Sequence, residues 1–362
     1  MDAGASLRPV SSDRPVFVVG CPRSGTTLLS LMLHAHPRIA MPPESRFLIS
    51  TWRDRDQWAD LSTREQQRRL ARSITRRRSR LDDLGLERKP TVRAIMQSPA
   101  TLGSAFGTVF AEYARLHGKA RWGDKRPLYY MEVDVLLRLF PDAQVVHIVR
   151  DPRANIASLK RMPWWPYDSV GSAAQWAHAE WCSRRNARRL PADTFHVVRY
   201  ESLVADPRRV LGELCAFLGE DFAEAMLEPA EVRDVVPERK TWHANLDSEI
   251  STERVEAWRE RLEPVEIGLA ETVLRRQLRR WDYPVTGAGR RPGPVLLARY
   301  VAAALARHVS SWLRWAQEGR WARRATYPVA AQLTSEQVAL ARRRGELQPP
   351  RGRRRPQSQP GA

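Results

Sequence analysis

Short apolar runs alternate along this chain with segments of helical periodicity. Three runs rich in β-branched residues are typical of buried parallel strands: residues 15–20, 145–149 and 195–198. Segments with apolar residues at helical spacing lie next to them: residues 26–35, 131–139 and 207–218. Strands that alternate with helices predict a parallel sheet covered on both faces, and therefore a doubly wound α/β domain flanked by helices.

The remaining pattern divides the chain into a core and a C-terminal extension. Residues 52–120 predict a mostly helical, Arg-rich insertion, whose clustered arginines indicate a solvated helix face rather than a polyanion site. Residues 251–281 predict a further helical stretch that is broken at Pro264, with Ser251 as its N-cap. We expect the core domain to comprise residues 1–286.

A Gly/Pro-rich linker at residues 287–294 precedes a predicted amphipathic, basic helical extension at residues 295–341. On a helical wheel one side of this extension is apolar: Leu297, Val301, Ala304, Leu305, His308, Trp312 and Trp315. The opposite side carries three arginines: Arg299, Arg307 and Arg314. Docking of the apolar side on the core is the favoured interpretation, and a partner subunit in a homodimer or peripheral contact with an anionic membrane are the alternatives. Residues 342–362 are rich in Arg, Pro and Gln and are expected to form a disordered basic tail.

Composition and charge narrow the class of protein. Apolar residues make up 43% of the 362 residues, enough to fill a core, and no uninterrupted apolar run is long enough to span a membrane. The first residues lack a signal-peptide pattern, so we expect a cytoplasmic protein. Three cysteines without close pairs predict neither disulfides nor a thiolate zinc site. Most of the net charge of +19 lies after residue 286, and the mild excess before it suits an anionic ligand without requiring nucleic acid.

Residues 20–27 (GCPRSGTT) have two glycines five residues apart, between a predicted strand and a predicted helix start. In that geometry, backbone N–H groups and the helix N-terminus converge on a phosphate. The spacing is that of a P-loop, but Thr26 occupies the position at which a nucleotide triphosphatase carries lysine. Arg23 supplies a positive charge within the loop instead. The sequence therefore predicts a P-loop type sheet with a phosphate site that is poorly equipped for metal-assisted γ-phosphoryl transfer, and we expect no metal requirement.

This loop and several later motifs resemble the sulfotransferase family. The loop is similar to the family's 5′-phosphosulfate loop, Pro-Arg/Lys-Ser-Gly-Thr-Thr. Similar stretches follow in the family's order: residues 29–47, 122–127, 139–159 and 198–218. They look like bacterial sulfotransferases and the related tyrosylprotein sulfotransferases, over residues 15–284 with little match at 52–121. The resemblance implies 3′-phosphoadenosine 5′-phosphosulfate (PAPS) as the sulfuryl donor, bound at its 5′ end by a set of loop residues: Arg23, Ser24, Gly25, Thr26 and Thr27.

Arg150 and Ser158 are the candidates for binding the 3′-phosphate of the donor. Arg150 follows a predicted strand, at the sheet edge where open α/β proteins bind ligands, and Ser158 lies about two turns into the helix that starts at Pro152. Arg can contact phosphate through two N–H groups, and Ser adds a hydroxyl donor. The resemblance implies this role for both and places Tyr200 near the nucleotide. An ion pair of Arg150 with Asp151 and core packing of Tyr200 are the alternatives.

Sulfuryl transfer is an in-line displacement between two oxygens, and it requires a base that removes the acceptor proton. Glu44 follows the first predicted helix by a short loop, and tyrosylprotein sulfotransferases carry their base in a similar Glu-Thr/Ser-Arg segment, so we interpret Glu44 as the base. Pairing with Arg46 or capping of the next helix is its alternative role. Lys125 lies in a segment similar to the family's Asp-Lys-Thr-Pro, which implies contact with the transferring group or the bridging oxygen. A surface pair with Asp124 is the alternative for Lys125.

Histidine is the base in cytosolic sulfotransferases, so four histidines are candidates beside Glu44: His34, His36, His147 and His243. The first two resemble a His-Pro helix end at which histidine packs or caps. His147 lies inside a predicted strand and indicates a core residue. His243 stays a weak alternative base.

The acceptor and two competing functions are left open by the sequence. Residues 162–167 (MPWWPY) are a candidate aromatic wall for the hydroxyl-bearing acceptor, which in this family is a carbohydrate, lipid, phenol or peptide, although such rings more often pack beneath a loop. A P-loop nucleotide kinase or NTPase is one alternative function, disfavoured by Thr26. The other is a basic membrane- or polyanion-binding adaptor with an inactive transferase core.

Overall fold

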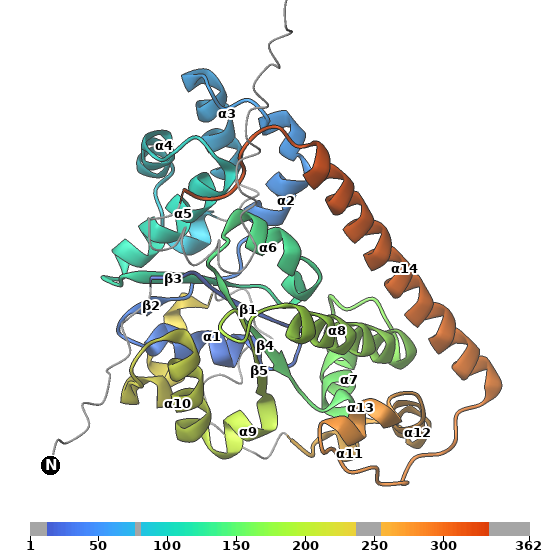
Figure 1. Ribbon diagram of the computed structural model, residues 1–362. Coiled ribbons are helices and arrows are strands. Elements are labelled where there is room, and N and C mark those ends of the chain that lie inside the picture. The colour runs from blue at the N-terminus through green and yellow to red at the C-terminus, as the bar shows by residue number, and fades with distance from the viewer. Residues whose placement is uncertain (1–12, 77–80, 237–254, 333–362) are drawn as a thin grey trace, which may run out of the picture.

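The computed structural model describes residues 13–76, 81–236 and 255–332, and a five-stranded sheet forms its centre (Figure 1). The strands are β1 (Val16–Gly20), β2 (Ile39–Ala40), β3 (Arg121–Lys125), β4 (Gln144–Val149) and β5 (Phe195–Arg199). Their order is β2-β3-β1-β4-β5, and all four pairings are parallel. The predicted doubly wound α/β fold is confirmed.

Helices cover both faces of the sheet (Figure 1). One face carries α1 (Thr26–Ala35), α9 (Tyr200–Ala205) and α10 (Pro207–Leu218), and the other carries α5 (Leu102–Leu116), α6 (Val133–Leu139) and α8 (Ser169–Arg189). Successive strand residues point to opposite faces, so Val18 of β1 packs with the first group and Phe17 with the second. Continuous apolar strands are therefore buried on both sides, as the runs in the sequence predict.

Two helices begin with the capping residues that their sequences carry. Asp151 accepts a hydrogen bond from the Arg153 N–H at the start of α7 (Pro152–Lys160), and Asp206 caps α10 in the same way. Proline occupies the first turn of both helices, where its missing N–H costs nothing. Gly219 ends α10 with φ 74°, a left-handed conformation that favours glycine.

The apolar pattern misses β3, because three of its five residues are charged. Arg121, Asp124 and Lys125 are all buried in it. The Arg121 guanidinium donates to the backbone oxygen of Arg14 and pairs with Glu220 at 3.2 Å. Buried polar groups require such partners, and hydropathy along the chain does not reveal them.

Helices fill the chain between β2 and β3 and again after α10. The first set is α2 (Phe47–Arg53), α3 (Arg64–Ile74) and α4 (Arg88–Gln97), followed by α5. The second set is α11 (Trp258–Arg261), α12 (Pro264–Val273) and α13 (Arg275–Arg280). Pro264 thus begins a helix, as the expected break in residues 251–281 requires, whereas Ser251 lies outside the described residues.

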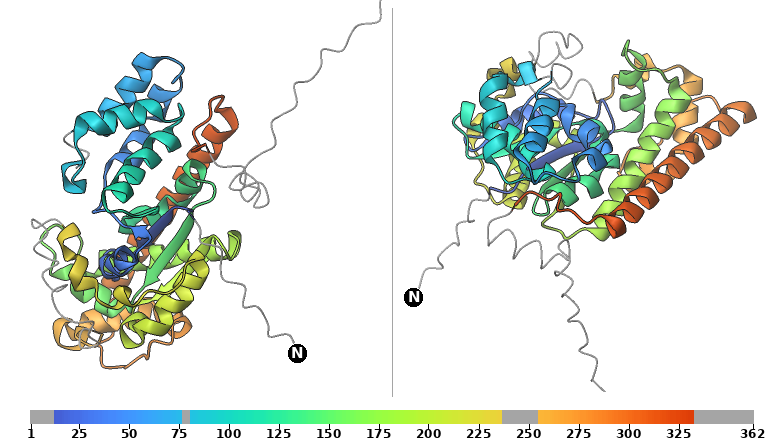
Figure 2. Two further views of the ribbon diagram at one scale, coloured as in Figure 1. Left: turned by 90° about the vertical axis from the view of Figure 1, so that its left-hand side faces the viewer. Right: turned by 90° about the horizontal axis from the view of Figure 1, so that it is seen from above.

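One long helix, α14 (Pro294–Arg324), follows the linker and lies along α8 (Figures 1 and 2). It ends at Arg324, well before the expected residue 341, and the chain then returns to the core. There the Val329 carbonyl accepts from the Gly103 N–H, and the Ala331 N–H donates to the Leu139 carbonyl. The predicted tail at residues 342–362 is outside the described residues. No helix among those described is long and apolar enough to cross a membrane.

The side of α14 that docks differs from the predicted one. Arg307 and Arg314, expected to face away from the core, lie against it, and Arg307 Nε donates to Gln175 of α8 at 3.0 Å. Leu305 and Trp312, expected on the docked side, are 59% and 64% exposed. Two members of the expected side do reach α8: His308 and Trp315. The prediction was wrong because a helical wheel ranks side chains by apolarity alone, whereas α8 offers polar partners.

Candidate active site

The loop between β1 and α1 has a left-handed backbone that α7 supports. Arg23 has φ 71° and Gly25 has φ 98°. A Cβ on Gly25 would lie 2.5 Å from Cδ2 of Tyr200, so a side chain does not fit there. The Asn155 amide of α7 donates to two loop oxygens, one of which is Ser24 Oγ at 3.1 Å. The shape of the loop therefore depends on α7 as well as on its own residues.

Four predicted donor-binding residues meet at this loop. Arg23 Nε donates to Ser158 Oγ at 3.1 Å, and Arg150 Nη1 donates to the Arg23 carbonyl at 3.2 Å. The Arg150 guanidinium lies 4.4 Å from the centre of the Tyr200 ring. Asp151, the alternative partner of Arg150, forms its 2.7 Å ion pair with a buried arginine two residues further on. The carboxyl ends of β1 and β4, helix α7 and the start of α9 thus bring two guanidinium groups, a hydroxyl and a ring together.

The electrostatics of this cluster favour an anion. Burial and, after it, the charge of Arg150 lower the pKa of Arg23 to about 10. Like charges that share a partly buried site are unfavourable until a negative group lies between them. Thr26, at the start of α1, is buried below the same loop. Among the residues that the structure describes, no group of three or more His, Cys, Asp or Glu side chains is placed to hold a metal ion.

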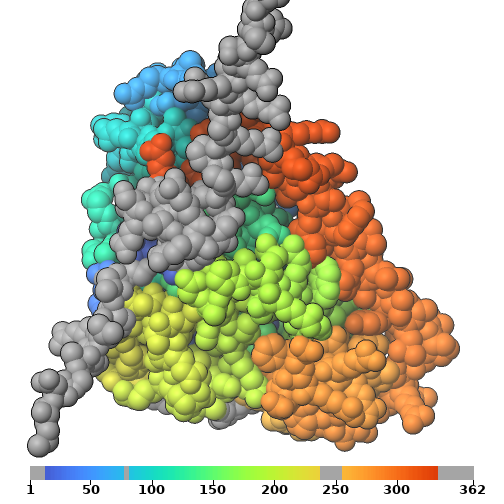
Figure 3. Space-filling model, in the orientation of Figure 1, coloured from blue at the N-terminus to red at the C-terminus, as the bar shows by residue number. Residues whose placement is uncertain are grey.

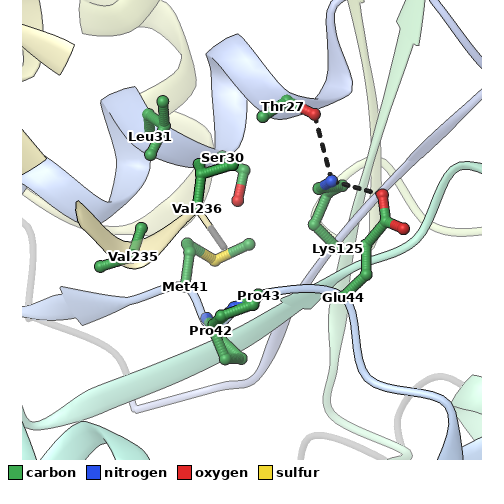
Figure 4. Close-up of a pocket in the computed structure, with 10 residues that line it drawn as sticks. All are labelled: Thr27, Ser30, Leu31, Met41, Pro42, Pro43, Glu44, Lys125, Val235 and Val236. Carbon is green, nitrogen blue, oxygen red and sulfur yellow. Dashed lines mark hydrogen bonds and ion pairs between the residues drawn. The ribbon is translucent and has the colours of Figure 1, made fainter. Parts of the chain in front are cut away.

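Glu44 and Lys125 form the second half of the site (Figure 4). Lys125 Nζ lies 2.6 Å from Glu44 Oε1 and donates to Thr27 Oγ1 at 3.2 Å. The side chain of Lys125 is 4% exposed, whereas that of Glu44 is 28% exposed and accessible from solvent. Lys125 therefore connects the base candidate to the first turn of α1. Its side chain pairs with Glu44, so the surface pair with Asp124 is not formed.

Asp124 supports this arrangement from within the sheet. Its carboxylate accepts hydrogen bonds from the Lys125 N–H (2.9 Å), the Tyr129 hydroxyl (2.9 Å) and the Ser45 hydroxyl (3.2 Å). Asp124 is fully buried, and burial raises its carboxyl pKa to about 6. One carboxylate thus holds the residue after Glu44 and the backbone of Lys125 in fixed positions.

A small hollow that is open to solvent lies beside Glu44 and Lys125 (Figure 4). Mostly apolar side chains line it: Thr27, Ser30, Leu31, Met41, Pro42, Pro43, Glu44, Lys125, Val235 and Val236. The aromatic segment 162–167 is not part of this lining. Its Trp165 instead donates an indole N–H to Ser172 of α8. The predicted aromatic wall and the hollow next to the base candidate are therefore separate features.

Three of the four histidines considered as bases lie among the described residues, and each is placed as a structural residue. His34 and His36 are buried, and each accepts a backbone N–H through Nδ1. His147 is buried in β4, and burial lowers its pKa to about 3. His243 lies outside the described residues.

Sequence reasoning missed Asn155 and the full role of Asp124. Asn155 precedes Ser158 by three residues, and this spacing places both on one face of α7, toward the loop. Asp124 directly precedes Lys125 in a strand, so that their side chains point to opposite faces. The helical spacing of Asn155 and Ser158 and the alternation of Asp124 and Lys125 carry information only once the helix and the strand have been predicted. The sequence pattern does not predict β3.

The fold defines this chain as an α/β protein with a parallel sheet, and the loop from β1 to α1 lies at the carboxyl edge of that sheet. Comparison with known sequences is more specific, because the profile described as "Sulfotransferase family" matches residues 15–224, more than half of the chain. This chain belongs to the sulfotransferase family.

Two curated relatives in this family have low sequence identity to this chain. The protein-tyrosine sulfotransferase of Drosophila melanogaster is 27% identical over 223 residues, which cover 60% of this chain and 40% of the relative. The nodulation protein NoeE of Sinorhizobium fredii is 28% identical over 225 residues, 57% of this chain and 50% of the relative. The matched region thus spans half the length of these relatives or less. Among solved structures, the sulfotransferase domain of the Synechococcus PCC 7002 olefin synthase is 27% identical with a TM-score of 0.48, and the match covers 74% of this chain and 98% of that domain.

Proposed function

We propose that this protein is an O-sulfotransferase that moves a sulfuryl group from PAPS to a hydroxyl acceptor, with Glu44 as the general base. The observation that carries the proposal is the contact of Lys125 Nζ with Glu44 Oε1 at 2.6 Å and with Thr27 Oγ1 at 3.2 Å, next to the loop. A base, a movable cation and a phosphate-type loop are the parts that sulfuryl transfer needs.

The donor-binding half of the site fits a ligand with two separate phosphate groups. The loop N–H groups, Thr26 and Thr27 at the start of α1 suit the 5′-phosphosulfate. Arg150 and Ser158 suit the 3′-phosphate. The resemblance implies that Arg23 binds the 5′ end, but its side chain contacts Ser158 and its carbonyl accepts from Arg150, so we assign Arg23 to the 3′-phosphate as well. The two arginines repel each other, and a bound phosphate would relieve that repulsion.

In the proposed reaction the acceptor oxygen attacks the sulfur of PAPS in line with the bridging oxygen. A new S–O bond forms to the acceptor, and the bond from sulfur to the bridging oxygen breaks, so its electron pair stays on the 5′-phosphate of adenosine 3′,5′-bisphosphate (PAP). Glu44 takes the acceptor proton, and the ammonium of Lys125 stabilises the charge on the leaving oxygen. When the Lys125 ammonium moves from Glu44 to the leaving oxygen, the Glu44 carboxylate becomes free to accept the proton of the acceptor.

The hollow next to Glu44 suits an acceptor whose hydroxyl is attached to an uncharged, partly apolar group. Leu31, Met41 and Val236 supply apolar lining, and Ser30 adds one hydroxyl. Among the relatives, one acts on protein tyrosine by its name, an acceptor that also carries its hydroxyl on an apolar ring.

The experiment compares Glu44→Gln with Arg23→Ala, using labelled PAPS and a pool of hydroxyl acceptors. Glu44→Gln keeps the shape of the side chain, so PAP should still raise the thermal stability while transfer falls by about 10² to 10⁴, the usual range for a general base. Arg23→Ala should weaken PAP binding as well as turnover, because it removes charge from the loop. For the parent chain, PAP at a 100-fold excess over its Kd should add about 2.7 kcal/mol of stability, and adenosine 5′-monophosphate much less.

Glu65→Gln, at an exposed position of α3, is the matched control and should change neither the transfer rate nor the stabilisation by PAP. Transfer by Glu44→Gln at the parent rate with an alkyl alcohol would remove Glu44 from the mechanism. Equal stabilisation by PAP and adenosine 5′-monophosphate would contradict the roles given to Arg150 and Ser158.

A further inference from the structure

The outward side of α14 is apolar over about three turns. Val301, Leu305, Val309 and Trp312 are 52%, 59%, 55% and 64% exposed. Their spacing of three or four residues places them on one side of the helix. Figure 2 shows α14 at the edge of the molecule with α8 along its other side, and in Figure 3 it forms the right-hand border of the surface. A contiguous exposed apolar side of this kind marks an interaction surface.

The inward side of the same helix combines aromatic and polar side chains. Trp315 stacks on Trp181 of α8, with ring centres 5.2 Å apart. Ser311 is fully buried, and its Oγ lies 2.8 Å from His178 Nε2 and 2.9 Å from Arg314 Nη2. One turn earlier, Arg307 Nε donates to Gln175. A helix that packs on a globular core ordinarily turns its apolar side inward and its polar side to water. Helix α14 departs from this arrangement, because it buries Ser311 and half-buries Arg307 and Arg314, while a second apolar strip on its outward side stays exposed among the described residues.

Basic residues frame this apolar side at both ends. Five exposed arginines lie just before α14 or in its last turns: Arg290, Arg291, Arg320, Arg323 and Arg324. The single acidic residue of α14, Glu318, turns inward and pairs with Arg55 at 3.2 Å. Near the start of the helix, Arg299 pairs with Asp168. Beyond the described residues, the sequence of residues 333–362 contains seven arginines and two glutamates.

We propose that the outward side of α14 binds the surface of an anionic lipid bilayer. The helix would lie in the plane of the membrane, with its apolar side chains at the boundary between headgroups and acyl chains and the arginines at its ends on lipid phosphates. Trp312 is suited to this boundary, because its ring is apolar and its indole N–H is polar.

Charge favours a lipid surface over a second copy of the chain. Two copies that faced each other along α14 would place arginines against arginines at both ends of the helix, whether the helices ran parallel or antiparallel. An anionic bilayer supplies the opposite charge at both ends and apolar volume between them. The proposal does not depend on the sulfuryl transfer reaction, because none of these side chains belongs to the candidate active site.

The test measures binding of the full-length protein to vesicles by flotation. Vesicles of phosphatidylcholine alone are compared with vesicles of phosphatidylcholine and phosphatidylglycerol in equal amounts, each at low and high salt. The parent chain should bind the anionic vesicles at least tenfold more tightly, with binding reduced by salt. The double variant Leu305→Ser, Trp312→Ser should lose at least tenfold in this affinity. Because both side chains are exposed, its thermal stability and its response to PAP should be unchanged.

Leu116→Ser is the matched control, since Leu116 is 53% exposed on α5 and lies outside α14. This control should bind the anionic vesicles as the parent does. Undiminished binding by the double variant would overturn the proposal and assign membrane contact to the basic tail alone. A parent chain that binds neither kind of vesicle, but forms a dimer in light scattering that the double variant loses, would overturn it in favour of a second copy.

Discussion

Replacement of Asp124 by asparagine tests how the sheet holds the candidate active site. The carboxylate is fully buried and accepts hydrogen bonds from the Lys125 N–H and the hydroxyls of Ser45 and Tyr129. Asparagine has the same shape, its oxygen can keep the bond from Lys125, and its amide can donate to one hydroxyl. The substitution therefore removes the charge and leaves the contacts largely in place.

The size of the effect on the free energy of unfolding follows from the carboxyl pKa of Asp124, which burial raises from 3.8 to about 6. A raised carboxyl pKa means that the folded state holds the proton more tightly than the unfolded chain. The contribution of this group to stability is thus fully present below pH 4 and is lost as the pH rises through about 6. The loss amounts to about 3 kcal/mol, since each pKa unit corresponds to about 1.36 kcal/mol. Asparagine cannot ionise, so Asp124→Asn avoids this loss.

The assay is the free energy of unfolding in urea at pH 4 and pH 8, for the parent chain and for Asp124→Asn. The difference in free energy of unfolding between the variant and the parent should be about 2 to 3 kcal/mol more favourable to the variant at pH 8 than at pH 4. Any effect of the amide that does not depend on pH cancels in this comparison. Asp82→Asn, at an exposed position, is the control and should gain nothing. A difference between Asp124→Asn and the parent that is the same at both pH values would refute the reasoning.

Two further predictions concern the loop and the C-terminal extension. Gly25→Ala should weaken PAP binding at least tenfold in calorimetry, because the new methyl group would lie 2.5 Å from the Tyr200 ring and the left-handed backbone costs about 1 to 2 kcal/mol. Gly212→Ala, which meets open space on α10, should bind PAP normally. A chain that ends at Thr286, the expected end of the core, should have a lower Tm, because it exposes the sides of α5 and α8 that Val329 and α14 cover. An unchanged Tm would show that the extension is energetically separate.

Apolar strands and well-capped helices could be predicted from the sequence, and charged elements could not. The runs at 145–149 and 195–198 became β4 and β5 almost residue for residue, because strands buried on both faces are apolar throughout. Strand β3 could not be predicted from the apolar pattern, because the partners of its charged residues come from distant segments, such as Glu220 for Arg121. The docked side of α14 was misjudged for a related reason, because the polar groups that receive Arg307 belong to α8.

The candidate site also has one part that could be predicted from the sequence and one part that could not. Arg150 and Ser158 could be predicted as one phosphate site from a strand end and the helix that follows it. In the structure the Arg23 side chain contacts Ser158, and Arg150 donates to the Arg23 carbonyl. The contact between Glu44 and Lys125 could not be foreseen, because the two residues are 81 positions apart and neither lies in an apolar run. Only the parallel pairing of β1 with β3 brings the second segment next to the loop that follows β1.

The hydrogen bonds from Asn155 to the loop have a consequence for how fast a donor can bind. The helix that carries Asn155 also carries Ser158, so the loop and the hydroxyl that faces Arg23 move as one body. The conformational entropy of the left-handed loop is therefore lost when the chain folds, and little of it remains to be lost when a ligand arrives. Association should then be governed by diffusion and by the positive charge of the two arginines, with an on-rate that falls as salt is added and no slow rearrangement after encounter.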